Sequence, residues 1–117
     1  MDKIAKINRG KSMNAHVRSL INKSKDKPVV QVRIKKIKHI LRRNPWPRGL
    51  GPKSVMKNPN KSIFHKAHHH RIVNAELKYP VILSKGGKGK LNMRDGYHRL
   101  TKAAMINHSK TISAKIL

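Results

Sequence analysis

Apolar and polar residues alternate most regularly in two segments, one in the first half of the chain and one near its end. Over residues 30–35, and again over residues 111–117, every second residue is apolar and those between are mostly polar. A period of two is typical of a strand that buries one face. We therefore predict a half-buried strand in each segment.

A spacing of three or four between apolar residues predicts three helices. The first follows the early strand at residues 37–41 and is only one or two turns long. The second should begin near Asn60 or Ser62, because either side chain can cap a helix, and should reach Ala75. The third should span residues 97–107, with apolar residues along one face.

Proline, glycine and short apolar runs divide the rest of the chain. Residues 44–52 hold three prolines and two glycines, which predicts a loop without regular structure. Residues 79–84 predict a short buried strand, residues 85–90 a glycine-rich hairpin turn, and residues 91–93 the returning strand. The order of elements predicts a small α+β domain with a mixed sheet and two to three helices.

The first 28 residues differ from the rest because they are basic and hold few large apolar groups. Two structures fit them: a disordered basic arm, or one short amphipathic helix. The helix would use four apolar residues at helical spacing: Met13, Val17, Leu20 and Ile21. We expect a basic tail over residues 1–28 and a domain over residues 29–117, with a core drawn mostly from residues 63–117 and the first strand.

The net charge of the chain limits its possible functions more than its apolar pattern does. The chain of 117 residues holds 29 Lys and Arg against 4 Asp and Glu, a formal net charge of +25. Charges of one sign repel one another and oppose compaction, so we expect an anionic partner. Nucleic acid is the expected partner, with DNA favoured over RNA, and an anionic membrane or an acidic protein surface is the alternative. We expect phosphate contacts from basic residues of the tail and of the first strand and helix: Lys3, Lys6, Arg9, Lys11, Arg18, Lys35, Lys36, Arg42 and Arg43.

Other features of the composition exclude particular kinds of site and of protein. The chain has no cysteine, which excludes disulfides and zinc sites with Cys ligands. It has no run of about 18 apolar residues, so we expect no membrane span, and its basic N-terminus does not resemble a secretory signal. We expect a soluble intracellular protein, or one packaged with a genome in a virion or nucleoid.

Chemistry-bearing residues concentrate in the segment from Arg94 to Ala103. A strand is expected to end here, with Gly96 in the turn and a helix after it. The unpaired N–H groups of a helix N-terminus attract anions, and His98 and Arg99 would add donors that suit phosphate. Asp95 could cap the helix, or hold a metal or a hydroxyl, and is the one candidate catalytic group.

This segment, Asp-Gly-Tyr-His-Arg-Leu-Thr-Lys-Ala, resembles the ParB/sulfiredoxin-like superfamily, which carries a related box at a strand-to-helix turn. The resemblance covers residues 29–117 and includes the lead-in from Arg71 to Leu83. It implies a phosphate or nucleotide pocket formed by Gly96, His98 and Arg99, and it would allow His68 or Arg71 to point into that pocket. A nucleoside triphosphate with magnesium would be the cofactor.

Other features of the sequence qualify what this resemblance implies. The box has no cysteine, which excludes the sulfiredoxin reaction. Glu76 and Asp95 are the only acids within residues 29–117, so magnesium-dependent catalysis would have little carboxylate help and enzymatic activity stays open.

Three smaller features each have a simpler interpretation. His65 and His69 have the i, i+4 spacing of metal ligands, but no third ligand is evident and we predict no metal site. Residues 86–90 lack the spacing of a P-loop and fit a hairpin with phosphate-touching lysines. Trp46 could stack on a base, but we favour an anchor that holds its loop on the core.

We therefore expect a nucleic-acid-binding, genome-associated protein that contacts phosphates with little base-specific recognition. Two alternatives remain: a small nucleotide-dependent enzyme, either an NTPase or a kinase, and a structural virion protein in a larger assembly.

Overall fold

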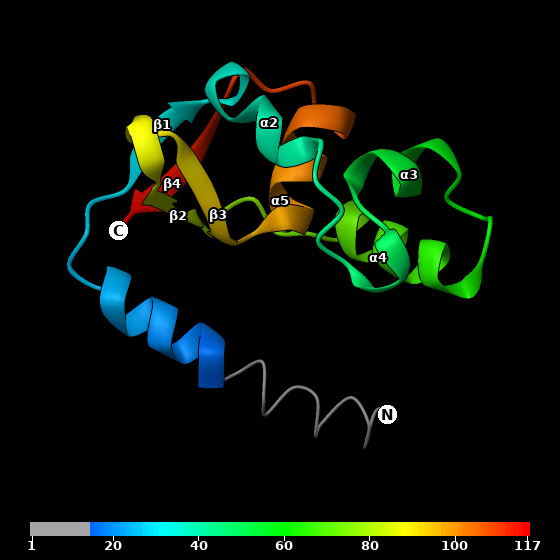
Figure 1. Ribbon diagram of the computed structural model, residues 1–117, viewed down its shortest axis with the longest axis horizontal. Helices are drawn as coiled ribbons and strands as arrows, with labels where there is room; N and C mark the ends of the chain where they lie inside the picture. The colour runs from blue at the N-terminus through cyan, green and yellow to red at the C-terminus, as the bar shows by residue number, and fades with distance from the viewer. Residues whose placement is uncertain (1–14) are drawn as a thin grey trace.

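A four-stranded mixed sheet forms one side of the molecule in the computed structural model, which describes residues 15–117 (Figure 1). Its strands are β1 (Val30–Arg33), β2 (Val81–Lys85), β3 (Leu91–Asp95) and β4 (Thr111–Ile116). Their order in the sheet is β1-β4-β2-β3, with β4 antiparallel to β1 and parallel to β2. β2 and β3 form the predicted antiparallel hairpin. The predicted α+β class with a mixed sheet is confirmed.

Short helices cover the sheet and extend away from it. The α-helices are α2 (Lys38–Leu41), α3 (Pro52–Lys57), α4 (Ile63–Val73) and α5 (Tyr97–Thr101). The shorter turns are the 3-10 helices η1 (Ile34–Ile37), η2 (Pro47–Gly49) and η3 (Gly87–Gly89), and the π-helix η4 (Lys102–Ile106), which continues α5. Residues 15–24 are also helical, so the described helices outnumber the two to three expected.

The first strand is shorter than its alternating pattern predicts. β1 ends at Arg33, and Ile34 begins η1 while its backbone N–H still donates to the carbonyl of Lys110 at 2.9 Å. Val32 is the only residue of β1 that is buried. The chain therefore turns into the helical layer one residue after the strand, which lets Ile34 pack into the core.

The prediction that residues 44–52 form only a loop is wrong at its end, because Pro52 begins α3. Proline is tolerated in the first turn of a helix, where its missing N–H would have had no partner. Ser54 Oγ accepts a hydrogen bond from the N–H of Gly51 at 3.0 Å and donates one to its carbonyl at 3.1 Å. Gly51 and Pro52, which were assigned to the loop, therefore form the start of the helix α3.

The predicted cap of the long helix is confirmed. Ser62 Oγ accepts hydrogen bonds from the backbone N–H groups of Phe64 and His65, each at 3.2 Å. The helix α4 ends at Val73, earlier than the predicted Ala75.

Two buried clusters form the core, and α5 packs between the elements that carry them. The larger cluster joins the sheet to η1, α2 and α5, and the smaller one consists of Leu50, Val55 and Ile72. The larger cluster draws on both halves of the chain: Val32, Ile34, Ile37, Ile40, Leu41, Val81, Leu83, Leu100, Ala103, Ile112 and Ala114. The expected core over residues 63–117 and the first strand was too narrow, because η1, α2 and α3 also contribute.

The helix over residues 15–24 agrees with the helical alternative for the tail. Leu20 is 2% exposed and Ser24 is also buried, whereas Ile21 on the same turn is 53% exposed. Met13 lies outside the described residues. Within residues 15–117, no helix has the length and apolar character needed to cross a membrane.

Candidate functional site

The turn at Gly96 links β3 to α5 and lies where the sequence predicted it. Gly96 has φ = 119°, a left-handed conformation that suits glycine. A Cβ built on it would lie 2.6 Å from Cγ1 of Val81. Backbone conformation and close packing on β2 therefore both require glycine here.

The two charged residues of the turn bind one another. Arg99 Nη2 donates to Oδ2 of Asp95 at 2.6 Å, and its Nη1 donates to the carbonyls of Tyr79 and Pro80 at 3.4 and 3.1 Å. The two side chains are 18% and 32% exposed. Asp95 makes no capping hydrogen bond to α5, so the capping interpretation of this residue is wrong. A phosphate at this turn would have to compete with the carboxylate for the guanidinium.

Three aromatic rings from distant segments meet beside this turn. The ring centroids of His68 on α4 and His98 on α5 lie 4.3 and 4.6 Å from that of Trp46, with interplanar angles of 9° and 7°. The two imidazoles are 5.3 Å apart and joined by a hydrogen bond of 3.0 Å between His68 Nδ1 and His98 Nε2.

These distances fix how the rings are arranged. If the indole lay between the imidazoles, their centroids would be separated by twice a stacking distance, and they could not form a hydrogen bond. Both imidazoles therefore lie edge to edge on one face of the indole of Trp46. Trp46 also packs against the smaller apolar cluster, which agrees with its predicted role as a loop anchor.

The surroundings of the histidines keep them uncharged. Burial, followed by the nearby His68, Arg71 and Arg99, lowers the pKa of His98 from 6.5 to about 4. The pKa of His68 is also lowered, first by burial and then by Arg71 and His65. Arg71 is exposed on α4, one turn after His68.

Neutral imidazoles at this position are better suited to hydrogen bonding and stacking with a ligand than to accepting a proton. A general base works best when its pKa is near the working pH, and the pKa of His98 lies well below neutrality. In the hydrogen-bonded pair one ring donates and the other accepts, which leaves one nitrogen of each ring for another partner. The arrangement can therefore orient a ligand, with Arg71 supplying positive charge beside it.

The remaining histidines of α4 do not converge. His65 is buried and its Nδ1 is hydrogen-bonded to Oγ of Ser62 at 2.7 Å, while His70 faces Asn74 one turn later. Among the described residues, no three His, Asp or Glu side chains gather where they could hold a metal ion.

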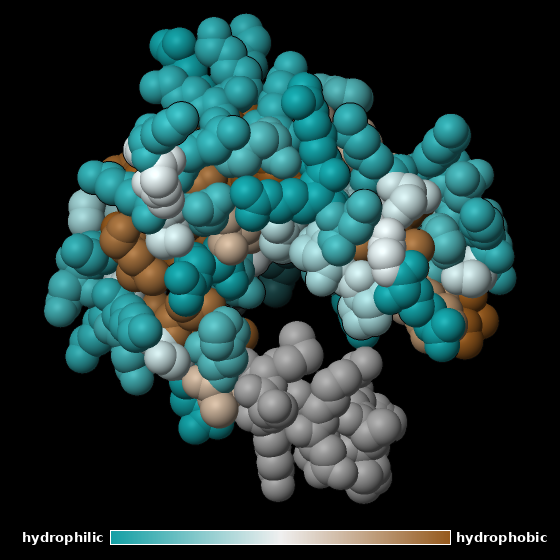
Figure 2. Space-filling model, in the orientation of Figure 1, coloured by the Kyte–Doolittle hydropathy of each residue, from teal (hydrophilic) through white to brown (hydrophobic). Residues whose placement is uncertain are grey.

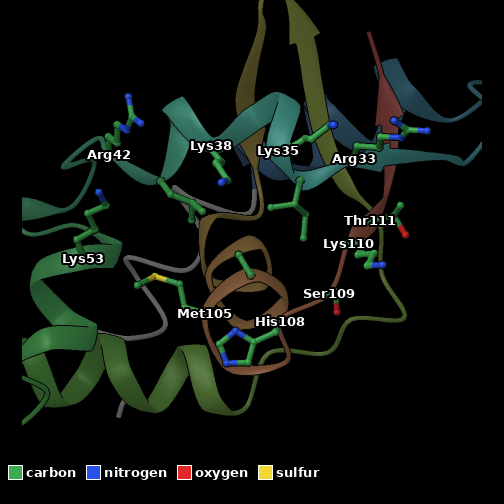
Figure 3. Close-up of a pocket in the computed structure, with 13 residues that line it drawn as sticks. Arg33, Lys35, Lys38, Arg42, Lys53, Met105, His108, Ser109, Lys110 and Thr111 are labelled. Carbon is green, nitrogen blue, oxygen red and sulfur yellow. The ribbon is translucent and has the colours of Figure 1, made fainter.

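A second candidate site lies at the opposite end of the α5–η4 helix. A groove of about 830 Å³ runs between η1 and α2 on one side and the end of η4 on the other (Figure 3). We call it the basic groove, and its lining consists of Arg33, Ile34, Lys35, Lys38, Leu41, Arg42, Lys53, Ala104, Met105, His108, Ser109, Lys110 and Thr111. Six of these described residues are Lys or Arg, and none of them is acidic.

The predicted phosphate-binding residues divide between this groove and other places. Lys35 and Arg42 line the groove, whereas Lys36 and Arg43 do not, and Arg43 instead donates to Oδ1 of Asn92 at 3.1 Å. Arg18 is exposed on the helix over residues 15–24. Four others lie outside the described residues: Lys3, Lys6, Arg9 and Lys11.

One signal for the groove was present in the sequence. Lys35, Lys38 and Arg42 are spaced by three and four, which places them on one helical face. The contributions of Lys53, and of the turn before β4, depend on tertiary packing and had no local signal. His108 in that turn has a positive φ of 51°, which the sequence also did not predict.

Comparison of the chain with protein-family models, with curated proteins and with solved structures finds no match, so the candidate sites rest on their own geometry.

Proposed function

We propose that this protein binds nucleic acid through contacts to phosphates. The observation that carries the proposal is an excess of positive charge that the protein does not neutralise internally. Against 29 Lys and Arg stand 4 acids, and between described residues only two ion pairs form, Asp95 with Arg99 and Glu76 with Lys78. Most of the visible face is hydrophilic (Figure 2).

The basic groove supports the same proposal because it concentrates this charge in a concave surface. Its six Lys and Arg side chains come from β1, η1, α2 and the residue that follows it, α3, and the turn before β4. Lysine and arginine neutralise phosphates and release the counterions condensed on nucleic acid. Backbone phosphates are the same for every sequence, so binding of this kind should depend little on base order.

The test is the salt dependence of binding to two unrelated DNA duplexes, measured by fluorescence anisotropy. If six or more phosphates are contacted, affinity should fall by on the order of a thousandfold between about 50 and 200 mM salt, and equally for both sequences. Matching RNA duplexes compare the two nucleic acids, with DNA expected to bind more tightly. An affinity that does not change with salt, or a strong preference for one DNA sequence, would refute the proposal.

Two variants that lose the same number of charges test which surface of the protein contacts DNA. Replacing Lys35, Lys38, Arg42 and Lys53 by Gln removes four charges from the basic groove. Replacing Lys61, Lys78, Lys85 and Lys115 by Gln removes the same charge elsewhere. The first set should weaken DNA binding more than the second, and equal losses would show that only the total charge matters.

A nucleotide site at the Gly96 turn is the second candidate, as the ParB/sulfiredoxin-like resemblance implies. It is favoured by the convergence of His68 and Arg71 with His98 and Arg99, which lie about thirty residues later in the chain. Isothermal titration with ATP and CTP, with and without magnesium, should give a saturable heat that Arg99→Ala weakens. The absence of saturable heat with either nucleotide would remove this candidate.

A further inference from the structure

The basic groove is not uniformly charged along its length. Figure 3 shows Arg42 and Lys53 at one end and Arg33 and Lys110 at the other, with Met105 between them. The apolar residues of its lining are Ile34, Leu41, Ala104 and Met105. Between the two ends, Lys38 projects into the groove from the side opposite Met105 (Figure 3). The groove therefore has cations at both ends and, between them, an apolar floor around Met105 that Lys38 faces.

Two uncommon backbone conformations lie beside this apolar floor. The helix that supplies Ala104 and Met105 widens here into the π-helix η4, closed by a hydrogen bond of 2.9 Å from the N–H of Asn107 to the carbonyl of Lys102. The chain then turns back through His108, whose φ is 51°. π-turns and left-handed residues other than glycine are uncommon and occur often at functional sites. Ala104 and Met105 are half-buried in this segment, whereas Ala103 is buried.

A ligand that matches this order needs an apolar unit with an anionic group on each side. A nucleic-acid strand has that order, because a phosphate precedes and follows every nucleoside. A free nucleotide carries its phosphates on one side only. In a duplex the bases are stacked and paired inside, so they cannot reach an apolar floor.

We infer that the basic groove binds a segment of single-stranded nucleic acid, with a base on the floor around Met105 and its flanking phosphates at the two cationic ends. This inference rests on the proposed function, since it specifies which form of nucleic acid the groove takes. It differs from the candidate nucleotide site at the Gly96 turn, which lies at the other end of the same helix.

The experiment compares a labelled oligothymidylate of roughly twelve nucleotides with a hairpin duplex of the same phosphate count, using the full chain and fluorescence anisotropy. Met105→Ser removes apolar contact from the floor. It should weaken single-strand binding about tenfold while hardly changing hairpin binding, because loss of one base contact affects only an exposed base. Ile106→Ser is the matched control, since Ile106 is the next residue, is 37% exposed and does not line the groove. It should leave both affinities unchanged.

A second pair of variants changes only exposed side chains, so we expect both to fold normally. Lys38 and Lys85 are both exposed, but only Lys38 lines the groove. Lys38→Gln should therefore reduce single-strand affinity more than Lys85→Gln does. Circular dichroism verifies that each variant is folded.

Each of the other outcomes overturns the inference in a recognisable way. Equal binding of strand and hairpin, with no selective effect of Met105→Ser or Lys38→Gln, refutes it and leaves the proposed function standing. Binding of neither nucleic acid refutes both. Displacement of the strand by thymidine monophosphate assigns the groove to a free nucleotide. Displacement by polyglutamate of equal charge assigns it to an acidic peptide.

Discussion

His98 is held neutral in the folded protein, and this makes stability depend on pH. Its pKa is about 4 when folded and 6.5 in an unperturbed chain, mainly because the ring is buried. As pH falls from 6.5 to 4, the unfolded chain gains a proton that the folded protein does not. The free energy of unfolding should therefore decrease through this window by about 2–3 kcal/mol and not recover below it.

Urea unfolding at a series of pH values measures this decrease. His98→Asn should reduce the slope between pH 6.5 and 4, because the titrating group is gone. His16→Asn is a suitable control, since His16 is an exposed histidine on the helix over residues 15–24. A slope in His98→Asn identical to that of the unmodified chain would contradict the assigned pKa.

The two ion pairs of the described chain should differ in strength because they differ in exposure. In the pair of the Gly96 turn, Arg99 is 18% exposed and also bonds two backbone carbonyls. In the pair between Glu76 and Lys78 both side chains are more than 60% exposed. Asp95→Asn should lower the free energy of unfolding by about 1–3 kcal/mol, since it leaves a partly buried guanidinium without its carboxylate.

Glu76→Gln is the matched control for that measurement. An exposed pair is screened by water and contributes about 0–0.5 kcal/mol, so this variant should unfold almost as the unmodified chain does. Chemical denaturation of both variants measures the two losses in the free energy of unfolding. Equal losses would show that the contact between Asp95 and Arg99 is no stronger than a surface ion pair.

At the scale of elements, the connection from β3 to α5 depends on one glycine. Gly96→Ala should cost about 3 kcal/mol or more, because it combines a left-handed φ with a Cβ 2.6 Å from Cγ1 of Val81. Gly89 in the hairpin also has a positive φ, of 75°, but its Cβ would meet open space. Gly89→Ala should therefore cost only about 1 kcal/mol. Thermal unfolding compares the two, and a similar loss in both would mean that β2 moves to accommodate the methyl group.

Elements with a local signal could be predicted from the sequence, and those that depend on packing could not. The strand near residues 111–117, the hairpin and the cap at Ser62 were predicted because alternation, glycine and a capping hydroxyl act within a few residues. The helix α3 was missed because a proline that ends one segment can also begin another. The π-turn of η4 was missed because its sequence also suits an ordinary helix.

The candidate sites divide in the same way. The residues of the Gly96 turn were found from a contiguous motif. Their contacts outside the motif were not, because the carbonyls that bond Arg99 and the imidazole that bonds His98 come from other segments. The stack of His68 and His98 on Trp46 joins three segments that no local pattern connects. In the basic groove, helical spacing could have indicated Lys38, but only the fold brings Lys53 beside Arg42 (Figure 3).

For the whole molecule, the net charge of +25 should make stability sensitive to simple salt. Repulsion among the cations opposes the folded state, and dissolved ions screen it over a distance of about 10 Å at 0.1 M salt. The melting temperature of the chain without nucleic acid should therefore rise by about 5 °C when sodium chloride is increased from low to moderate concentration. Differential scanning fluorimetry measures this shift. A melting temperature that falls with salt would show that attractive pairs outweigh the repulsion.

The position of β4 between β1 and β2 determines when the protein can fold. β1 pairs with β4 across some eighty residues, as in the register of Val32 with Ile112, and β2 reaches β1 only through β4. Contacts so distant along the chain slow folding, since a long loop must close before any of them forms. During synthesis β1 therefore has no partner strand until residues 111–116 are made, whereas β2 and β3 can already pair with each other. Completion of the four-stranded sheet is then a late event, which stopped-flow refolding can follow by far-ultraviolet circular dichroism.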